Sequence, residues 1–204
     1  MSEQVHLQLL QATKGLVSLR QAIENNGVMS LSAQQPVQFF IYLARSVAAQ
    51  QLSNAAASTI WSRVIKAAGS EAGLYDFCVE SHYQQLRGCG LSNSKVKTIL
   101  GLRSALESGE LGDSLFQSQD RKFITQELTK LWGIGPWTAD MAAIFFFALP
   151  NIWAPGDAAL VRGLEFFASK EGVEPTMILK LTEPYHSYLA LHIWHCWDTD
   201  ILTG

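Results

Sequence analysis

Residues 131–140 read Leu-Trp-Gly-Ile-Gly-Pro-Trp-Thr-Ala-Asp, with two glycines and a proline between two segments of helical periodicity. Helical periodicity follows Asp120 over residues 121–131 and resumes directly after Pro136. Glycine accepts positive φ angles and has no side chain, and proline is well tolerated in the first turn of a helix. The stretch therefore predicts a helix, a Gly-x-Gly turn and a second helix.

Such a turn is a candidate anion site. Backbone N–H groups at a helix N-terminus have no acceptor inside the helix, and the helix dipole favours negative charge there. A phosphate could approach the main chain closely at Gly133 and Gly135, which can take positive φ angles and carry no side chain. The alternative is a tight turn between packed helices, in which the glycines serve geometry alone. Gly-x-Gly is too short a motif to separate the two.

Helical periodicity also dominates the rest of the chain. It is clearest over residues 37–48, after Pro36, and over residues 54–68, between the expected N-cap Ser53 and Gly69. Further helices are expected over residues 5–26, 94–108, 158–170 and 183–197. The sequence contains no alternating strand-like run and no internal repeat, so we expect an all-α unit of roughly nine or ten helices at typical lengths.

The composition is that of a globular chain without disulfides. It has 204 residues, 48% of them hydrophobic, enough for a sizeable core. Cys78, Cys89 and Cys196 are widely spaced, which argues against a disulfide framework and a clustered zinc or iron–sulfur site. No charged-then-apolar leader opens the chain, and the apolar run over residues 141–150 is too short to span a bilayer. We expect an intracellular protein.

The charge balance does not favour a nucleic-acid partner. Lys and Arg total 15 against 18 for Asp and Glu, which gives a net charge of −3. An acidic chain has no overall electrostatic attraction for DNA. Any DNA-binding function must therefore depend on local features.

The hairpin stretch and the segment that follows it resemble the helix-hairpin-helix DNA glycosylases. Their signature is the hairpin, a Pro/Gly-rich loop and then Asp, and residues 131–163 read LWGIGPWTADMAAIFFFALPNIWAPGDAALVRG. Gln-Gln-Leu-Ser at residues 50–53 and Pro-Tyr-His-Ser-Tyr-Leu-Ala-Leu-His-Ile-Trp at residues 184–194 resemble motifs of the branch that excises alkylated bases, the 3-methyladenine DNA glycosylase II type. The resemblance covers residues 37–197. The chain departs from it at His186, where the branch has Arg, and at Met141, where it often has an aromatic residue.

The resemblance implies an all-α, compact, two-lobed helix-hairpin-helix glycosylase fold with the active-site cleft between the lobes. We expect residues 1–204 to form a single glycosylase unit. In it, residues 37–135 would make the central helical lobe that ends in the hairpin, and residues 1–36 and 136–204 the second helical lobe. No strand-like segment precedes Pro36, so we expect a minimal version without the N-terminal sheet domain of some members.

The implied activity is that of a monofunctional glycosylase of base excision repair. Such an enzyme hydrolyses the N-glycosidic bond of alkylated purines, such as 3-methyladenine and 7-methylguanine, after flipping them out of duplex DNA. By resemblance Asp157 is the catalytic carboxylate, which would stabilise the cationic sugar and help direct water. Its position after Pro-Gly also suits an ordinary N-cap. Bifunctional members place a lysine at the second residue after Gly-x-Gly, where this chain has Trp137, so we expect no lyase activity.

The resemblance also assigns the base pocket and a wedge. Trp137, Trp194 and Met141 would line the pocket, where an aromatic face attracts a cationic alkylpurine. Leu52 would fill the gap left by the flipped base, and Gln51 would contact the flanking or orphaned base. The alternative for Leu52 is a core position at the start of the next helix.

The hairpin would bind phosphate and a cation. By resemblance its phosphate-binding residues are Gly133, Ile134 and Gly135. The main-chain carbonyls of three residues would hold a monovalent cation, Na⁺ or K⁺, that bridges to the phosphate: Thr129, Leu131 and Ile134. Basic residues of the helix over 94–108 would add phosphate contacts or form a solvated face: Lys95, Lys97 and Arg103.

We expect no required cofactor, and as partner a double-stranded DNA with a damaged base. We expect a monomer without membrane association, cytoplasmic and nucleoid-associated in a bacterium or nuclear in a eukaryote. Two other functions remain open: the same hydrolysis on uracil, hypoxanthine or ethenoadenine, and a non-catalytic helix-hairpin-helix protein that recognises DNA structure. Trp132, beside the hairpin glycines, receives no role.

Overall fold

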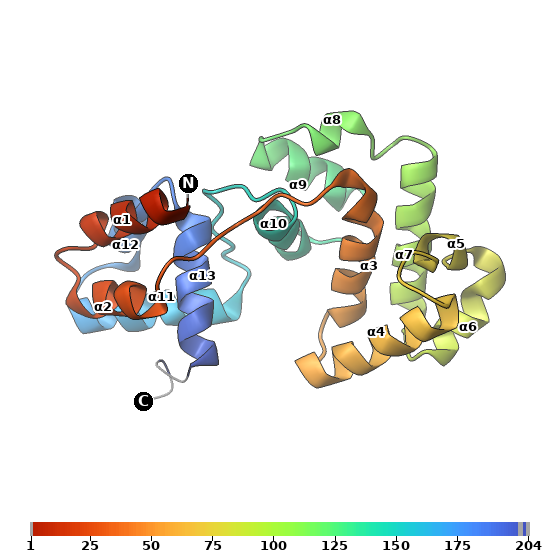
Figure 1. Cartoon of the computed structure of the whole chain (residues 1–204), viewed down its shortest axis with the longest axis horizontal. Coiled ribbons are helices and arrows are strands. Elements are labelled where there is room, and N and C mark those ends of the chain that lie inside the picture. The colour runs from red at the N-terminus through yellow and green to blue at the C-terminus, as the bar shows by residue number, and fades with distance from the viewer. Residues whose placement is uncertain (1, 200–201, 203–204) are drawn as a thin grey trace. The chain divides into compact units, whose positions relative to one another are not determined.

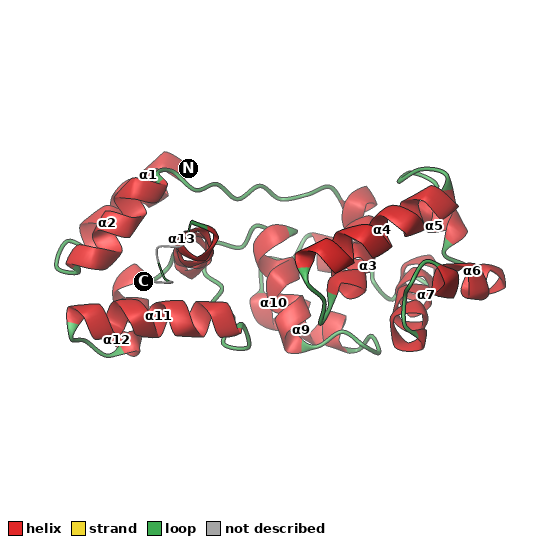
Figure 2. Cartoon of the chain, turned by 90° about the horizontal axis from the view of Figure 1, so that it is seen from below, coloured by secondary structure: helices red, strands yellow, loops and turns green. Residues whose placement is uncertain are grey.

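Helices make up all of the regular secondary structure in the computed structural model, which describes residues 2–199 and 202 (Figure 1). Within these residues the helices are joined by loops alone (Figure 2), which confirms the predicted all-α fold. The described residues form more helices than the roughly nine or ten expected, because elements of four to six residues are too short to show periodicity. None of the helices in this part of the chain is long and apolar enough to cross a membrane.

The chain divides into two compact units, one of residues 1–33 and 143–204 and the other of residues 34–142. The first contains α1 (Ser2–Ala12), α2 (Val17–Asn26), α11 (Ala158–Glu171), α12 (Pro175–Thr182) and α13 (His186–Asp198). The second contains the 3-10 helices η1 (Pro36–Gln38) and η2 (Glu80–His82), and α3 (Phe39–Ala49), α4 (Asn54–Ala68), α5 (Leu74–Phe77), α6 (Tyr83–Gly88), α7 (Asn93–Glu107), α8 (Asp113–Phe116) and α9 (Arg121–Thr129). The division falls within α10 (Pro136–Phe145).

This division differs from the expected one at residues 135–136, and bonds from α10 to its neighbours explain why. Arg121 donates from Nε and Nη2 to the buried Asp140 carboxylate, at 3.0 and 2.8 Å. The Tyr42 hydroxyl donates to the Met141 carbonyl oxygen at 3.0 Å. The first two turns of α10 therefore belong with α3 and α9, in the second unit.

Helix α3 is the centre of the second unit. Its apolar face, which includes Phe40, Leu43 and Val47, is buried, as the periodicity predicts. It packs against both α4 and α7. The predicted N-cap Ser53 accepts a hydrogen bond from the Ala56 amide at the start of α4. Since α3 ends at the Gln-Gln-Leu-Ser segment, its packing also fixes where that segment emerges.

Helices α11 and α13 pack together in the first unit. A Cβ on Gly163 would collide with the Ile193 side chain, so glycine lets the two helices approach closely. The prediction of one helix over residues 5–26 is wrong, because this segment forms α1 and α2. Glu171 is the last residue of α11, and its carboxylate accepts hydrogen bonds from the Val17 and Ser18 amides. A side chain distant in sequence therefore caps the start of α2.

Candidate functional site

The predicted hairpin is present as α9, a turn and α10. Gly133 has a φ angle of +84°, and a Cβ there would collide with the Thr98 hydroxyl of α7. Gly135 lies outside the positive-φ region, and a Cβ there would meet no atom within 4 Å. Gly133 is therefore needed for backbone shape and packing. Gly135 needs no positive φ angle and leaves open space beside the main chain.

The turn uses part of its own hydrogen-bonding capacity. The Ile134 amide donates to the Leu131 carbonyl oxygen at 3.1 Å, and the Ala139 amide donates to the Gly135 carbonyl at 3.1 Å. Of the three residues predicted to bind phosphate, Ile134 thus has its N–H engaged within the turn. Gly133 and Gly135 remain the candidates for an anion contact.

The Gln-Gln-Leu-Ser segment, residues 50–53, is held by side chains from two directions. Gln50 donates from Nε2 to the Gly133 carbonyl oxygen at 3.3 Å and to the Thr138 hydroxyl at 3.2 Å. Lys95 donates from Nζ to the carbonyl oxygens of Ala48 and Gln50, at 2.9 and 2.8 Å. The segment is therefore braced against both α7 and the hairpin.

The braced segment presents the predicted wedge to solvent. Leu52 is 38% exposed, which excludes the alternative of a core leucine. Gln51 is exposed and has a φ angle of +57°, a conformation uncommon for residues other than glycine. Sequence reasoning singled out Gln51 and Leu52 but missed the bracing role of Gln50, for which the sequence holds no signal beyond the motif.

The predicted pocket residues of α10 differ in accessibility. Trp137, in the first turn, is 39% exposed. Met141, one turn later, is buried, with 7% of its surface exposed. The indole of Trp137 can therefore contact a ligand directly, whereas the Met141 side chain presents little surface.

Asp157 and Trp194 lie together in the first unit. Asp157 is the N-cap of α11, and its Oδ1 accepts a hydrogen bond from the Leu160 amide at 2.9 Å. Trp194 of α13 donates from Nε1 to the same oxygen at 3.4 Å. Both side chains are half-buried. The carboxylate is thus held at a helix N-terminus, where the dipole favours its ionised form.

Phe145 completes this group and was missed by sequence reasoning. It is 36% exposed and stacks on Trp194, with ring centroids 5.5 Å apart and planes at 30°. The available signal was its place two turns after Trp137, at the head of the Phe145–Phe147 run. A fixed carboxylate beside two stacked rings is suited to stabilising a cation.

The start of α13 anchors the loop that leads to Asp157. Ser187 donates from its hydroxyl to the Leu149 carbonyl oxygen at 2.6 Å and accepts from the Ile152 amide at 3.0 Å. His186, which stands where the resembling branch has Arg, places its Nε2 2.8 Å from the Leu179 carbonyl oxygen. These two side chains therefore bond to main-chain groups close to α13.

The three basic residues of α7, for which phosphate contacts and a solvated face were both open, differ in what they contact. Lys95 bonds to main-chain carbonyls, and Arg103 pairs with Glu107 at 2.8 Å. Lys97 places its Nζ 4.4 Å from the ring centroid of Trp132. Two of the three cations are thus engaged by protein oxygen atoms, which periodicity cannot predict.

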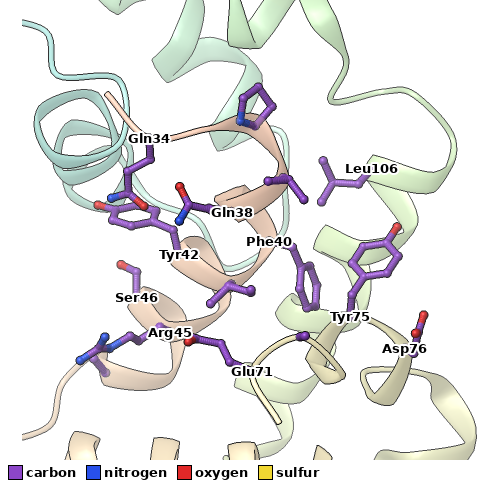
Figure 3. A pocket seen from close by; sticks show the side chains of 15 residues that line it. Gln34, Gln38, Phe40, Tyr42, Arg45, Ser46, Glu71, Tyr75, Asp76 and Leu106 are labelled. Carbon is purple, nitrogen blue, oxygen red and sulfur yellow. The ribbon is translucent and has the colours of Figure 1, made fainter. Parts of the chain in front are cut away.

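A pocket of about 1210 Å³ in the second unit has none of the predicted site residues in its lining (Figure 3). Its walls come mainly from η1, α3 and α5, and they include Tyr42, Arg45 and Tyr75. A smaller hollow of about 350 Å³ lies between residues 50–53, the start of α7 and the hairpin, and is lined by Leu52, Trp132 and Gly133 among others. The predicted wedge and hairpin therefore share the smaller hollow.

The described residues contain no group of three or more His, Cys, Asp or Glu side chains placed to hold a metal ion. The predicted cation ligands are main-chain carbonyls instead. Thr129 ends α9, where the last carbonyls of a helix lack intrahelical partners, and Leu131 and Ile134 follow within the turn. Leu131 already accepts one hydrogen bond, and a carbonyl oxygen has a second lone pair for a cation.

Known proteins with related sequences are named as glycosylases. The chain is 28% identical over 178 residues to a DNA-3-methyladenine glycosylase of Saccharomyces cerevisiae, a match that covers 80% of this chain and 59% of the relative. It is 28% identical over 155 residues to a putative DNA-3-methyladenine glycosylase of Bacillus subtilis, covering 71% of this chain and 54% of that protein. The chain thus spans between 54% and 59% of these relatives' lengths. No family model matches the chain.

Solved structures share the fold. The DNA-3-methyladenine glycosidase of Bacillus halodurans matches with a TM-score of 0.74 at 27% identity, over 93% of this chain and 88% of that chain. A 3-methyladenine DNA glycosylase of Schizosaccharomyces pombe, solved in complex with abasic DNA, matches with a TM-score of 0.72 at 20% identity, over 94% and 95% of the two chains. These matches confirm the fold class predicted from the sequence.

Proposed function

We propose that this chain, which is similar in sequence and fold to DNA-3-methyladenine glycosylases, is a helix-hairpin-helix glycosylase that hydrolyses the N-glycosidic bond of alkylated purines in duplex DNA. The observation that carries the proposal is the Asp157 carboxylate, which is held by the Leu160 amide and the Trp194 indole N–H at the start of α11. Phe145 stacks on Trp194 and so adds a second aromatic ring next to the indole.

The chemistry requires a fixed negative charge beside the sugar. The bond between C1′ and the base nitrogen breaks with both electrons leaving on the base, so positive charge develops on the deoxyribose. The Asp157 carboxylate stabilises that charge, and water then adds to C1′ and loses a proton. Because Asp157 is already oriented by two donors, it needs little reorganisation as the charge develops.

The aromatic residues favour a cationic base. A purine alkylated at N3 or N7 carries positive charge, and the face of a tryptophan or phenylalanine ring attracts a cation. Trp194, Phe145 and Trp137 all offer partly exposed rings. Such a base leaves as a neutral molecule and requires little protonation, which fits a site with one carboxylate.

The enzyme is monofunctional and of the 3-methyladenine DNA glycosylase II type. A lyase step needs an amine that attacks C1′ to form a Schiff base. At the position where bifunctional relatives of the resembling family carry that lysine, this chain has Trp137, whose partly exposed indole cannot act as the nucleophile. The product is therefore an intact strand with an abasic site.

The partner is a duplex with a damaged base, bound by a monomer. The Gly133 and Gly135 amides contact a backbone phosphate, and Leu52 enters the gap left by the flipped base. The main-chain carbonyls of Thr129, Leu131 and Ile134 would hold a monovalent cation, which would supply positive charge beside that phosphate and offset part of the net charge of −3. No other cofactor is required.

Base release from methylated duplex DNA tests this function. The full chain and its Asp157→Asn variant are incubated with the duplex, and released 3-methyladenine and 7-methylguanine are separated. Release by the parent and its loss in the variant support the proposal. DNA binding without release would overturn it in favour of another lesion, to be sought with uracil, hypoxanthine and ethenoadenine duplexes, or of a non-catalytic DNA-binding protein.

A further inference from the structure

The hairpin turn carries an exposed tryptophan. Trp132 lies in the turn directly before Gly133, and 53% of its surface is exposed. Exposing so large an apolar side chain loses the hydrophobic stabilisation that burial would bring. Its neighbours Leu131 and Ile134 in the same turn are buried, so the exposure belongs to this side chain rather than to the whole turn.

Lys97 of α7 pairs with this ring. Its Nζ lies 4.4 Å from the centroid of the Trp132 ring, within cation–π distance. The Lys97 side chain is exposed, so its ammonium group also faces water. Lys95 and Arg103, the other basic residues of α7, are bonded to protein oxygen atoms. Lys97 is thus the cation of α7 that lies against the hairpin tryptophan.

The position of the pair is rigidly set by packing beneath it. A side chain on Gly133 would collide with Thr98, the residue after Lys97, so the turn lies directly against α7. Gln50 ties the same turn to the segment that carries Leu52. The Trp132–Lys97 pair therefore keeps a fixed place relative to both the phosphate-binding turn and the wedge.

The indole forms a wall shared by two hollows. One, of about 350 Å³, is lined by Gln51, Leu52 and Gly133, and the other, of about 680 Å³, by α7 residues and by Tyr83 and Glu80. Trp132 lines both. It therefore extends the proposed DNA-contacting surface from the hairpin toward the outer face of α7.

We infer that Trp132 and Lys97 form an additional DNA-backbone contact next to the hairpin phosphate. This inference rests on the proposed function, because it takes the hairpin turn as the phosphate contact. Lys97 neutralises the neighbouring phosphate of the same strand, and the indole packs against the sugar between the two phosphates. Charge complementarity and continuity with the hairpin select the DNA backbone as the occupant. In an acidic chain such a contact supplies local attraction that the net charge does not.

Salt-dependent binding tests the inference. Affinity of the full chain for a labelled duplex with a stable abasic-site analogue is measured by fluorescence anisotropy at several salt concentrations. We expect Lys97→Gln to remove one phosphate contact. The plot of the logarithm of the association constant against the logarithm of the salt concentration should then have a slope that is shallower by about 0.9. The control Lys180→Gln removes the same charge from an exposed lysine of α12, and should leave the slope unchanged.

Trp132 is tested in the same assay. Trp132→Ala should weaken binding about tenfold, and Trp132→Phe, which keeps an aromatic ring, much less. In the double variant the two losses should not add, since the ring positions the ammonium group. Thermal melting checks each fold, and the Lys97→Gln slope decides the question if Trp132→Ala melts early. The inference would be overturned if Lys97→Gln left the salt slope unchanged and Trp132→Ala left the affinity for the duplex unchanged.

The design separates this inference from the proposed function. Base release is measured in parallel at saturating duplex, where the control Lys180→Gln should match the parent. Release by the parent with no binding effect in the variants would leave the function standing and refute the contact. A shallower slope with no base release by the parent would refute the function and support the contact.

Discussion

Trp194 donates its indole N–H to the Asp157 carboxylate, with 3.4 Å between Nε1 and Oδ1. The same oxygen also accepts from the Leu160 amide, so one carboxylate both caps a helix and faces an aromatic side chain. Structural and chemical roles for Asp157 are therefore compatible, and they can be separated by experiment.

Asp157→Asn should remove activity while preserving the fold. Asn is as good an N-cap as Asp, so the melting temperature should change little. The lost charge should slow base release at least a hundredfold, about 2.7 kcal/mol in the barrier. Single-turnover rates measure this. Asp120→Asn, at the N-cap of α9, is the matched control and should keep full activity. A variant Asp157→Asn protein as fast as the parent would refute the mechanism.

The two hairpin glycines should respond differently to alanine. In Gly133→Ala the alanine would have to adopt a positive φ angle, and its methyl group would collide with Thr98. We expect this change to lower the free energy of unfolding by about 2 kcal/mol or more. Gly135→Ala meets no protein atom, so urea unfolding should be nearly unchanged. Its methyl group should instead obstruct the phosphate and weaken duplex binding about tenfold. Equal duplex affinity of Gly135→Ala and the parent would contradict a phosphate contact at this turn.

Leu52→Ala should impair base flipping without harming stability. Because the side chain is 38% exposed, its truncation should change the free energy of unfolding by about 0.5 kcal/mol or less. Base release from a fully paired lesion should fall about tenfold, and less when the lesion is mismatched and already weakly paired. Leu181→Ala, a similarly exposed leucine of α12, serves as control. A loss of equal size on paired and mismatched lesions would argue against a wedge.

Arg121→Gln should destabilise the second unit through Asp140. Burial raises the pKa of the Asp140 carboxyl, and the Arg121 guanidinium opposes that rise. Without Arg121 the buried charge loses its partner, and we expect a loss of about 2 kcal/mol at pH 7, less than for a fully buried pair because Arg121 is partly exposed. A raised pKa in the folded state means that stability is recovered as the pH falls. The penalty should therefore shrink near pH 4 in urea titrations; an equal penalty at both pH values would contradict this.

His192 should make the protein less stable in mild acid. Burial, with smaller effects of His6 and His195, lowers the pKa of His192 to about 4. Between about pH 6.5 and pH 4 the unfolded chain binds a proton that the folded protein does not. The free energy of unfolding therefore decreases as the pH is lowered through this window, by roughly 3 kcal/mol in total. His192→Gln should flatten the pH dependence of the urea midpoint. His195→Gln, at an exposed position, should not.

Interactions within a few residues of sequence were enough to predict most of the framework. Apolar spacing identified the buried face of α3, and the N-caps Ser53 and Asp157 marked the starts of α4 and α11, because caps and periodicity depend on residues no more than four positions apart. The hairpin between α9 and α10 followed from the Gly-x-Gly-Pro order for the same reason.

Contacts between distant segments required the folded chain. Lys95 donates hydrogen bonds to carbonyl oxygens more than forty residues away, and Gln50 donates to the hairpin. Phe145 stacks on Trp194. No local sequence pattern predicts these pairs. The same holds for Gly133, whose need for glycine comes from Thr98 on another helix. Helix starts depend on short-range bonding, whereas the partner of each side chain depends on which helices pack together, and packing is a property of the whole chain.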